Sequence, residues 1–136
     1  MLDVENLIFT KVATSLRTEF TGIFVSGEQV AAPSTFPAAT IVEMDNSVYE
    51  RSIDSSATEN HVTVMYQAEA YSNKTSGRKA EAKKILANID TTMESLGFVR
   101  ITKSPMNNTD SSIYRMVARY RAVIGKDNDN YLSYHK

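Results

Sequence analysis

The residues that could perform catalysis or hold a metal are few in this chain and lie far apart. The histidines are His61 and His135, and there is no cysteine for a thiolate metal site or a disulfide. Glu43 and Asp45 alternate with Met44 on a predicted strand, so they should share one face of it, as a carboxylate pair would. Nothing in the local sequence suggests acid–base work, and solvated acids near a strand end are the simpler interpretation.

The longer motifs of enzymes and ion-binding proteins are also missing. The five glycines are scattered and form no phosphate-binding loop, and no serine lies in a nucleophile-elbow pattern. Residues 127–130 resemble the opening of a calcium loop, but Leu132 stands where that loop needs glycine. We therefore expect a protein that is not an enzyme, with no catalytic, cofactor-binding or metal-binding residue.

Charge, in contrast, is distributed very unevenly along the chain. Residues 1–70 hold ten acidic and three basic side chains, whereas residues 71–136 hold six acidic and twelve basic ones. The formal net charge of the whole chain is only −1. If the fold keeps the two halves on different surfaces, one copy is complementary to a second copy placed head to tail. If the halves lie against each other, they neutralise within one copy, and both alternatives stay open.

Two groups of basic residues suggest a partner. The first lies in the early turns of a predicted helix and consists of Arg78, Lys79, Lys83 and Lys84. Cations at a helix N-terminus oppose the helix dipole by roughly 0.3–1 kcal/mol each, so local stability does not explain them. They would meet acidic residues of another subunit, bind nucleic acid, or simply face solvent.

The second basic group lies on one face of the last predicted strand, residues 112–124. It consists of Arg115, Arg119 and Arg121. These arginines could meet Glu69 and Glu43 on neighbouring strands, or form the wet face of a half-buried sheet.

Hydrophobic spacing predicts the elements that would position these residues. Apolar residues every four positions from Val4 to Phe20 predict a first helix capped by Asp3, and a stripe from Ala82 to Leu96 predicts a second helix that Gly97 ends. Alternation predicts the strongest strand at 61–71. Shorter or weaker patterns predict strands at 23–25, 29–32, 39–44, 98–102 and 112–124, a long polar loop at 45–60, and a loop at 104–110.

These elements predict an α+β fold in a single domain. We expect a mainly antiparallel sheet with two helices packed on one face, covering residues 1–125, followed by an exposed C-terminal tail at 126–136. The acidic start, Met1 to Glu5, lacks the pattern of a signal peptide, and no apolar run approaches the roughly 20 residues that span a bilayer. The sequence thus favours a soluble, non-exported protein with no membrane partner.

At the level of motifs, nearly the whole domain, residues 5 to 125, resembles the tail terminator proteins of tailed bacteriophages, some of which are labelled tail completion or minor capsid proteins. The resemblance lies in the order and spacing of short motifs, none of them catalytic. The motifs are Phe36-Pro37, residues 41–46, residues 59–61, residues 64–66, residues 71–74, Gly77-Arg78-Lys79, Met93, residues 97–100, Pro105, Tyr114-Arg115-Met116 and Arg119-Tyr120.

The resemblance implies a structural virion protein. Such a subunit assembles as a ring, in this family a hexamer, on the last ring of the tail tube, stops its polymerisation and presents the surface that joins the head. Its implied partners are other copies of itself, the tail tube protein, the head-tail connector protein and, in a contractile tail, the sheath. It would be assembled in the host cytoplasm and reside in the neck of the virion.

A subunit interface of this kind needs a basic and an acidic side. We expect Arg78, Lys79, Lys83 and Lys84 on one side and Glu50, Asp54 and Glu59 on the other. DNA passes through the bore without sequence-specific binding, and an unbroken arginine lining would grip its phosphates, so Arg115, Arg119 and Arg121 are expected mainly in subunit contacts. The alternatives are another neck component, such as a stopper or adaptor, and a small nucleic-acid-binding module.

Overall fold

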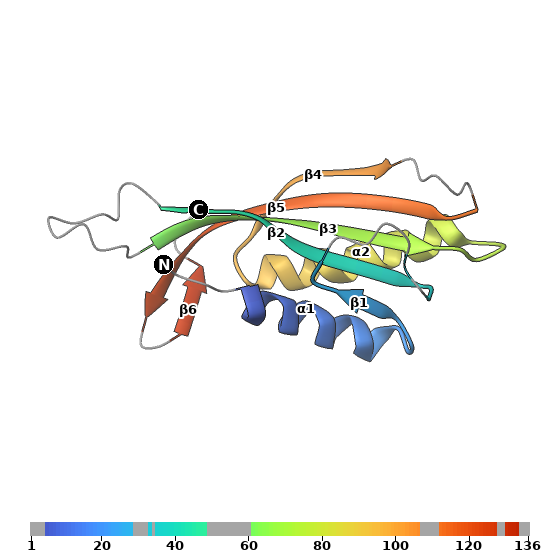
Figure 1. Cartoon of the computed structure of the whole chain (residues 1–136), viewed down its shortest axis with the longest axis horizontal. Coiled ribbons are helices and arrows are strands. Elements are labelled where there is room, and N and C mark those ends of the chain that lie inside the picture. The colour runs from blue at the N-terminus through green and yellow to red at the C-terminus, as the bar shows by residue number, and fades with distance from the viewer. Residues whose placement is uncertain are drawn as a thin grey trace, which may run out of the picture.

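The computed structural model describes residues 5–28, 33, 35–48, 61–106, 112–127 and 130–133 of the chain (Figure 1). These residues form two helices and six strands. In chain order the elements are α1 (Glu5–Glu19), β1 (Phe24–Ser26), β2 (Ala38–Val48), β3 (His61–Ser72), α2 (Arg78–Ser95), β4 (Val99–Met106), β5 (Tyr114–Asp127) and β6 (Asn130–Ser133).

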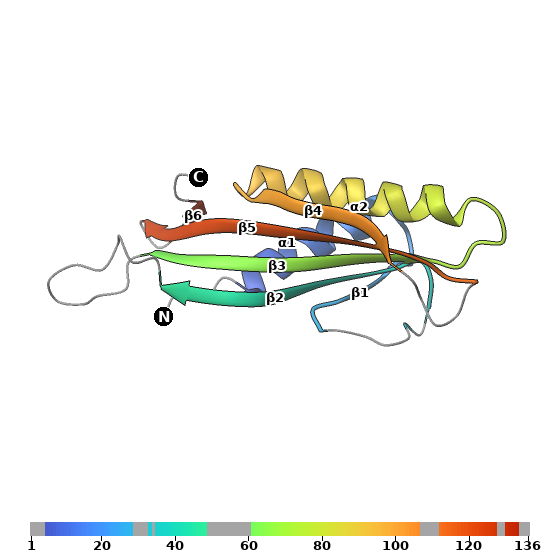
Figure 2. The ribbon, with the colours of Figure 1, turned by 90° about the horizontal axis from the view of Figure 1, so that it is seen from above.

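The strands form one mostly antiparallel sheet. Its order is β1-β2-β3-β5-β4, and β6 pairs with the far end of β5. Only the short β1 runs parallel to its neighbour, β2. Both helices lie on the same face of the sheet, as the two perpendicular views show (Figures 1 and 2). The structure therefore confirms the α+β class, with two helices on one face of a mainly antiparallel sheet.

The core lies between the helices and this face of the sheet. The alternating residues predicted to be apolar on β3, from Val62 to Ala70, are all buried, as are Met116, Ala118, Tyr120 and Ala122 on β5. From the helices they meet side chains repeated at helical spacing. These are Ile8, Val12 and Leu16 of α1, and Ala82, Ile85, Leu86, Ile89 and Met93 of α2.

Glycines with positive φ set the ends of the helices. Gly22 follows α1 with φ of 81°, and Gly77 precedes α2 with φ of 85°. After α2, the amide of Gly97 donates to Glu94 and the amide of Phe98 donates to Met93, each at 2.9 Å. This pair of hydrogen bonds around a glycine with positive φ is the Schellman motif, and it confirms the predicted end of the helix.

Three strands extend beyond their predicted ends into polar sequence. β2 runs to Val48, into the predicted loop 45–60, and β4 runs to Met106, into the predicted loop 104–110. β5 continues to Asp127 and forms a hairpin with β6, so the predicted tail 126–136 contains paired strand residues. Edge strands need no apolar alternation, because their pairing uses backbone groups and their side chains can face water. The predicted strand 29–32 and residues 49–60 lie outside the described residues.

Candidate functional site

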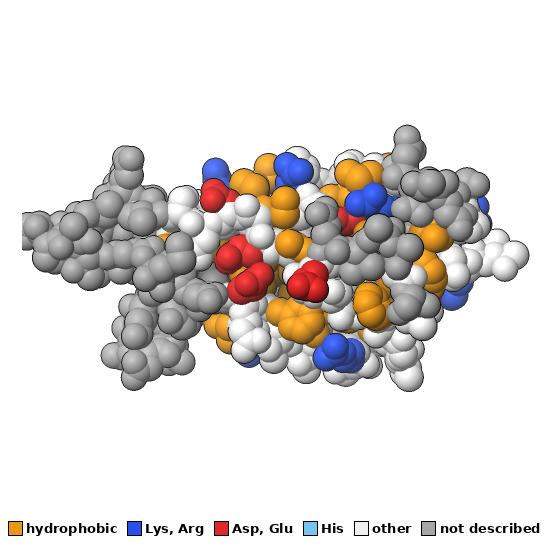
Figure 3. All heavy atoms as spheres, viewed as in Figure 1, with side chains coloured by type: hydrophobic (Ala, Val, Ile, Leu, Met, Phe, Trp, Pro, Cys, Tyr) orange, Lys and Arg blue, Asp and Glu red, His pale blue; other side chains and the backbone are white. Residues whose placement is uncertain are grey.

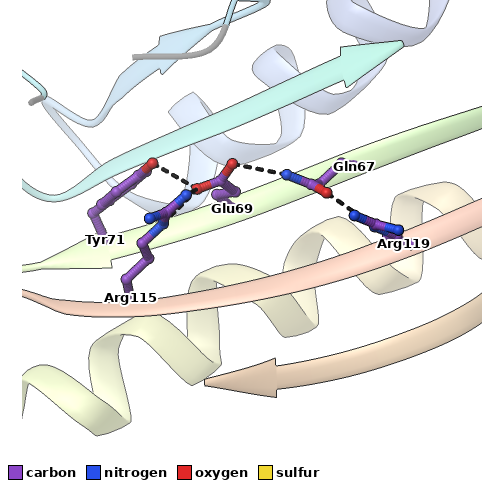
Figure 4. A network of polar contacts seen from close by, with 5 residues as sticks. All are labelled: Gln67, Glu69, Tyr71, Arg115 and Arg119. Atoms are coloured by element: carbon purple, nitrogen blue, oxygen red, sulfur yellow. Dashed lines mark hydrogen bonds and ion pairs between the residues drawn. The ribbon is translucent and has the colours of Figure 1, made fainter. Parts of the chain in front are cut away.

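A buried glutamate organises a polar network on the sheet face opposite the helices (Figure 4). Glu69 of β3 is only 1% exposed. Its Oε1 accepts hydrogen bonds from the Tyr71 hydroxyl at 2.7 Å and from Arg115 Nε at 2.6 Å, and Arg115 also forms an ion pair with it. Its Oε2 accepts from Gln67 Nε2 at 3.0 Å, while Gln67 Oε1 accepts from Arg119 Nε at 3.0 Å. The carboxylate is thus neutralised and fully hydrogen-bonded inside one copy.

The network decides how the three arginines of β5 are used. The predicted contact between Arg115 and Glu69 is confirmed, and the guanidinium also lies 5.6 Å from the centre of the Tyr71 ring. Arg115 is therefore engaged within the chain. Arg119 touches Gln67 and is otherwise exposed, and Arg121 is exposed on the same face, opposite Met65. The wet-face interpretation therefore holds for Arg119 and Arg121, which are exposed, but not for Arg115, which pairs with the buried Glu69.

The environment of Tyr71 fits the same picture. Burial raises the pKa of its hydroxyl above the ordinary value, and the hydrogen bond to Glu69 and the negative charge of that carboxylate raise it further. The phenol therefore stays protonated and donates to the carboxylate. Its role is to hold the glutamate in place.

A β-bulge in β2 separates the two acids that the sequence placed together. Glu43 lies opposite Tyr66 of β3, whereas Asp45 lies opposite Met65, the next residue on that strand. Because neighbouring residues of a strand point to opposite faces, the extra residue Met44 turns Glu43 towards the helices and Asp45 away from them. The expectation of a shared face is wrong. Glu43 accepts a hydrogen bond from the Tyr66 hydroxyl at 3.1 Å, and its position opposite Tyr66 places it on the face of the sheet opposite the arginines of β5.

The basic residues of α2 divide between two sides of the helix. Lys84 lines an open groove of about 440 Å³ between α1 and α2, together with Glu19. Lys79 and Lys83 are exposed. Lys83 follows Lys79 by four residues and Asp90 follows Lys83 by seven, so all three lie on the same side of the helix. Arg78 is half-buried and donates to the carbonyl of Lys74 at 3.4 Å.

The contacts of Asp90 show which strands lie beside this side of α2. Its carboxylate accepts a hydrogen bond from Tyr120 of β5 at 3.0 Å and forms an ion pair with Arg100 of β4 at 3.1 Å. Burial raises the pKa of the Tyr120 hydroxyl, and the charge of Asp90 raises it further. Lys79 and Lys83 therefore lie on the β4 side of the molecule. We call Lys79, Lys83, Arg100 and Lys103 the basic flank.

The opposite side of the molecule is acidic. Strand order places β1 and β2 at one edge of the sheet and β4 at the other. α1 contacts α2 and β2, whereas α2 packs over the central strands β3 and β5 and also reaches β4. The acidic side chains of α1 and β2, which we call the acidic flank, are Glu5, Glu19, Glu43 and Asp45. α1 also carries the exposed Lys11 and Arg17, and Glu19 accepts a hydrogen bond from Asn88 of α2, so the exposed acid at the sheet edge itself is Asp45. In Figure 3, acidic side chains gather in the middle of the face where Figure 1 shows α1 and β2.

Not every predicted interface residue can be placed. Glu50, Asp54 and Glu59 lie outside the described residues. Arg100, Lys103 and Asp90 were not predicted as candidates, although Asp90 follows Lys83 at helical spacing and could have been grouped with it. Gln67 and Tyr71 share the face of Glu69 by simple alternation, but their joint burial depends on strand pairing.

Within the described part of the chain, no group of three or more His, Cys, Asp or Glu residues could hold a metal ion. Neither described helix is long and apolar enough to cross a membrane. No protein-family model matches the sequence, and no curated protein matches it. The resemblance to tail terminator proteins therefore stays a prediction from the motifs named above.

Proposed function

We propose that this protein is a ring-forming structural subunit that ends a phage-type tail at its head-proximal end and provides the surface for head-tail joining. The observation that carries the proposal is the charge of the two edge strands: β2 at one edge carries the exposed Asp45, and β4 at the other carries the exposed Arg100 and Lys103. Such a subunit is complementary to its own copy in a head-to-tail arrangement. A heterologous contact of this kind closes into a ring when the rotation between copies allows it.

The contacts inside one copy also support this proposal. Lys74–Glu81 and Arg100–Asp90 are ion pairs within the base-rich half of the chain, and Arg115–Glu69 joins the halves at the central β3–β5 seam. Lys79, Lys83 and Lys103 are exposed on the basic flank, as Asp45 is on the acidic flank. The outer edges thus keep their opposite charges available to a neighbour.

The use of Arg115 agrees with a channel for DNA. Glu69 neutralises this arginine within the chain, so the β5 face is less basic than the sequence suggests. A bore with fewer free guanidinium groups would bind phosphates less tightly and let DNA pass.

The first test is the mass of the assembly under native conditions, measured by light scattering across protein concentration and salt. We expect a closed multimer at low salt that dissociates towards 1 M NaCl, because the Debye length falls from about 8 Å at physiological salt to about 3 Å there. A monomer at every concentration would contradict ring assembly. If that monomer binds DNA, the nucleic-acid-binding module becomes the better assignment.

The second test separates a terminator from other neck components. Electron micrographs of tails assembled with and without this protein should show tubes of uniform length in the first case and of uncontrolled length in the second. Uniform tubes in both cases, with heads failing to attach, would instead assign the protein as a stopper or adaptor.

A further inference from the structure

One edge of the sheet is an open strand. Among the described residues, β4 pairs with β5 and with no other strand, and all eight residues of β4 are exposed. Three of them are large apolar side chains, Val99, Ile101 and Met106, with 44–46% of their surface accessible. An open edge presents unpaired backbone donors and acceptors to any strand that fits it.

The opposite edge is also largely open. β1 pairs only with Ala38–Thr40, the first three of the 11 residues of β2. Along the remaining eight residues, 41–48, no described strand pairs with the outer side of β2. Met44 is 45% exposed there, and Asp45 is exposed beside it. The two open edges therefore have the same length, and each carries exposed apolar surface.

Electrostatic complementarity favours one of the three possible contacts between these edges in two copies: β4–β4, β2–β2 or β4–β2. Arg100 and Lys103 lie on β4, and Lys79 and Lys83 of α2 flank the same side, so two β4 strands brought together would face each other with like charges. The β2 edge carries Asp45 and belongs to the acidic flank. A β4–β2 contact brings opposite charges together, whereas β4–β4 and β2–β2 contacts are both repulsive.

Strand direction agrees with this choice. β2 is antiparallel to β3, β3 to β5, and β5 to β4, so β4 runs antiparallel to β2 within one copy. A second copy, rotated about an axis roughly along the strands, keeps the direction of its own β2. It then presents β2 antiparallel to β4 of the first copy, with the helices of both copies on the same side of the joined sheet.

We propose that β4 of one copy pairs with residues 41–48 of β2 in the next copy, as an antiparallel ladder that continues the sheet around the assembly. This inference rests on the proposed ring function and specifies its subunit contact. The partner is a second copy of this chain, identified by the opposite charge, equal length and matching direction of the two edges.

Cysteine pairs test the contact directly, because the chain contains no cysteine of its own. Ser104 of β4 lies opposite Val117 and Asp45 lies opposite Met65, so both belong to the sheet face away from the helices. An oxidised mixture of Ser104→Cys and Asp45→Cys proteins should give covalent dimers. Ser104→Cys is also mixed with Ser47→Cys, the next exposed position on that face, to cover a pairing shifted by two residues.

The control pair is Lys103→Cys mixed with Asp45→Cys. Lys103 neighbours Ser104 but belongs to the opposite face of β4, across from Ala118, so its sulfur cannot reach position 45 in a continuous sheet. Dimers of Ser104→Cys with Asp45→Cys or Ser47→Cys, and none for the control pair, support the ladder. Equal cross-linking of all pairs, or of none, in protein that still forms multimers overturns it and leaves the ring proposal standing.

A charge variant provides a second measurement. Lys103→Glu should weaken self-association at low salt by at least tenfold, whereas Lys11→Glu, the same charge change on the exposed side of α1, should not weaken it. Equal weakening by both variants would mean that net charge, and not the β4 edge, controls assembly, which overturns the ladder. An unmodified protein that stays monomeric at every concentration overturns the ring proposal itself.

Discussion

Replacing Arg115 by methionine should destabilise the fold far more than replacing Glu69 by glutamine. Arg115→Met keeps much of the side-chain volume but leaves the carboxylate of Glu69, which is 1% exposed, without its cation. Breaking a buried ion pair in this way costs about 3–5 kcal/mol. Because the Arg115 side chain is 21% exposed, water already weakens the pair, and we expect about 3 kcal/mol, at the low end of that range.

The glutamine variant, Glu69→Gln, leaves no buried charge behind. In Glu69→Gln the buried group becomes neutral, and Arg115 can turn its charge towards solvent, so we expect a loss of about 1–2 kcal/mol from weaker hydrogen bonds. In the double variant the amide no longer needs a cation. Its total loss should therefore fall short of the sum of the two single losses by about 1 kcal/mol or more.

Urea unfolding followed by far-UV circular dichroism measures these differences, since the chain has no tryptophan for fluorescence. With a slope of about 1–3 kcal/mol/M, a loss of about 3 kcal/mol should lower the Arg115→Met midpoint by roughly 1–3 M urea. Equal midpoints for the two single variants, together with additive losses in the double variant, would refute the view that Glu69 is a buried charge that depends on Arg115.

Three further predictions concern the rest of the fold. Because burial and Asp90 raise the pKa of Tyr120 in the folded state, its contribution to stability should be constant below the unfolded pKa of about 10 and be lost as pH rises above that value. Tyr120→Phe should therefore make the fall in stability less steep in urea titrations at about pH 8 to 11. Gly77→Val should lower stability by about 1–2 kcal/mol from backbone strain alone, since φ is 85° and no atom lies within 4 Å of an added Cβ, while Gly77→Asn should cost less in the same urea assay. Asn88→Ala should cost about 1 kcal/mol in thermal unfolding, because Asn88 accepts from Ser15 at 2.9 Å and donates to Glu19 at 2.5 Å across the α1–α2 groove.

The sequence predicted the parts of the fold that depend on local periodicity. The α2 stripe, its end at Gly97 and the alternation of β3 all follow from spacing within one segment, and the structure confirms them. The bulge at Met44 could not be predicted, because a one-residue insertion is defined by the partner strand. It changed the face of Asp45 and separated it from Glu43.

The candidate site was predictable to a smaller extent. A contact between Arg115 and Glu69 was foreseen from their facing strands, but the burial of Gln67 and Glu69 depends on the whole β3–β5 register. Two of the four residues of the basic flank were predicted from the sequence. Lys79 and Lys83 are part of a cluster of basic residues in the sequence of α2. Arg100 and Lys103 could not be grouped with them, because their position depends on β4 being the edge strand of the sheet.

The central pairing of β3 with β5 has a consequence for synthesis of the chain. His61 of β3 pairs with Gly125 of β5, so β3 cannot complete its inner pairing until a segment 64 residues further along the chain (125 − 61) has left the ribosome. Until then the nascent chain carries an apolar strand with an unsatisfied inner edge, a state that invites aggregation. Emergence of β5 is thus the step that closes the middle of the sheet, and β4 can take its place at the edge only beside β5.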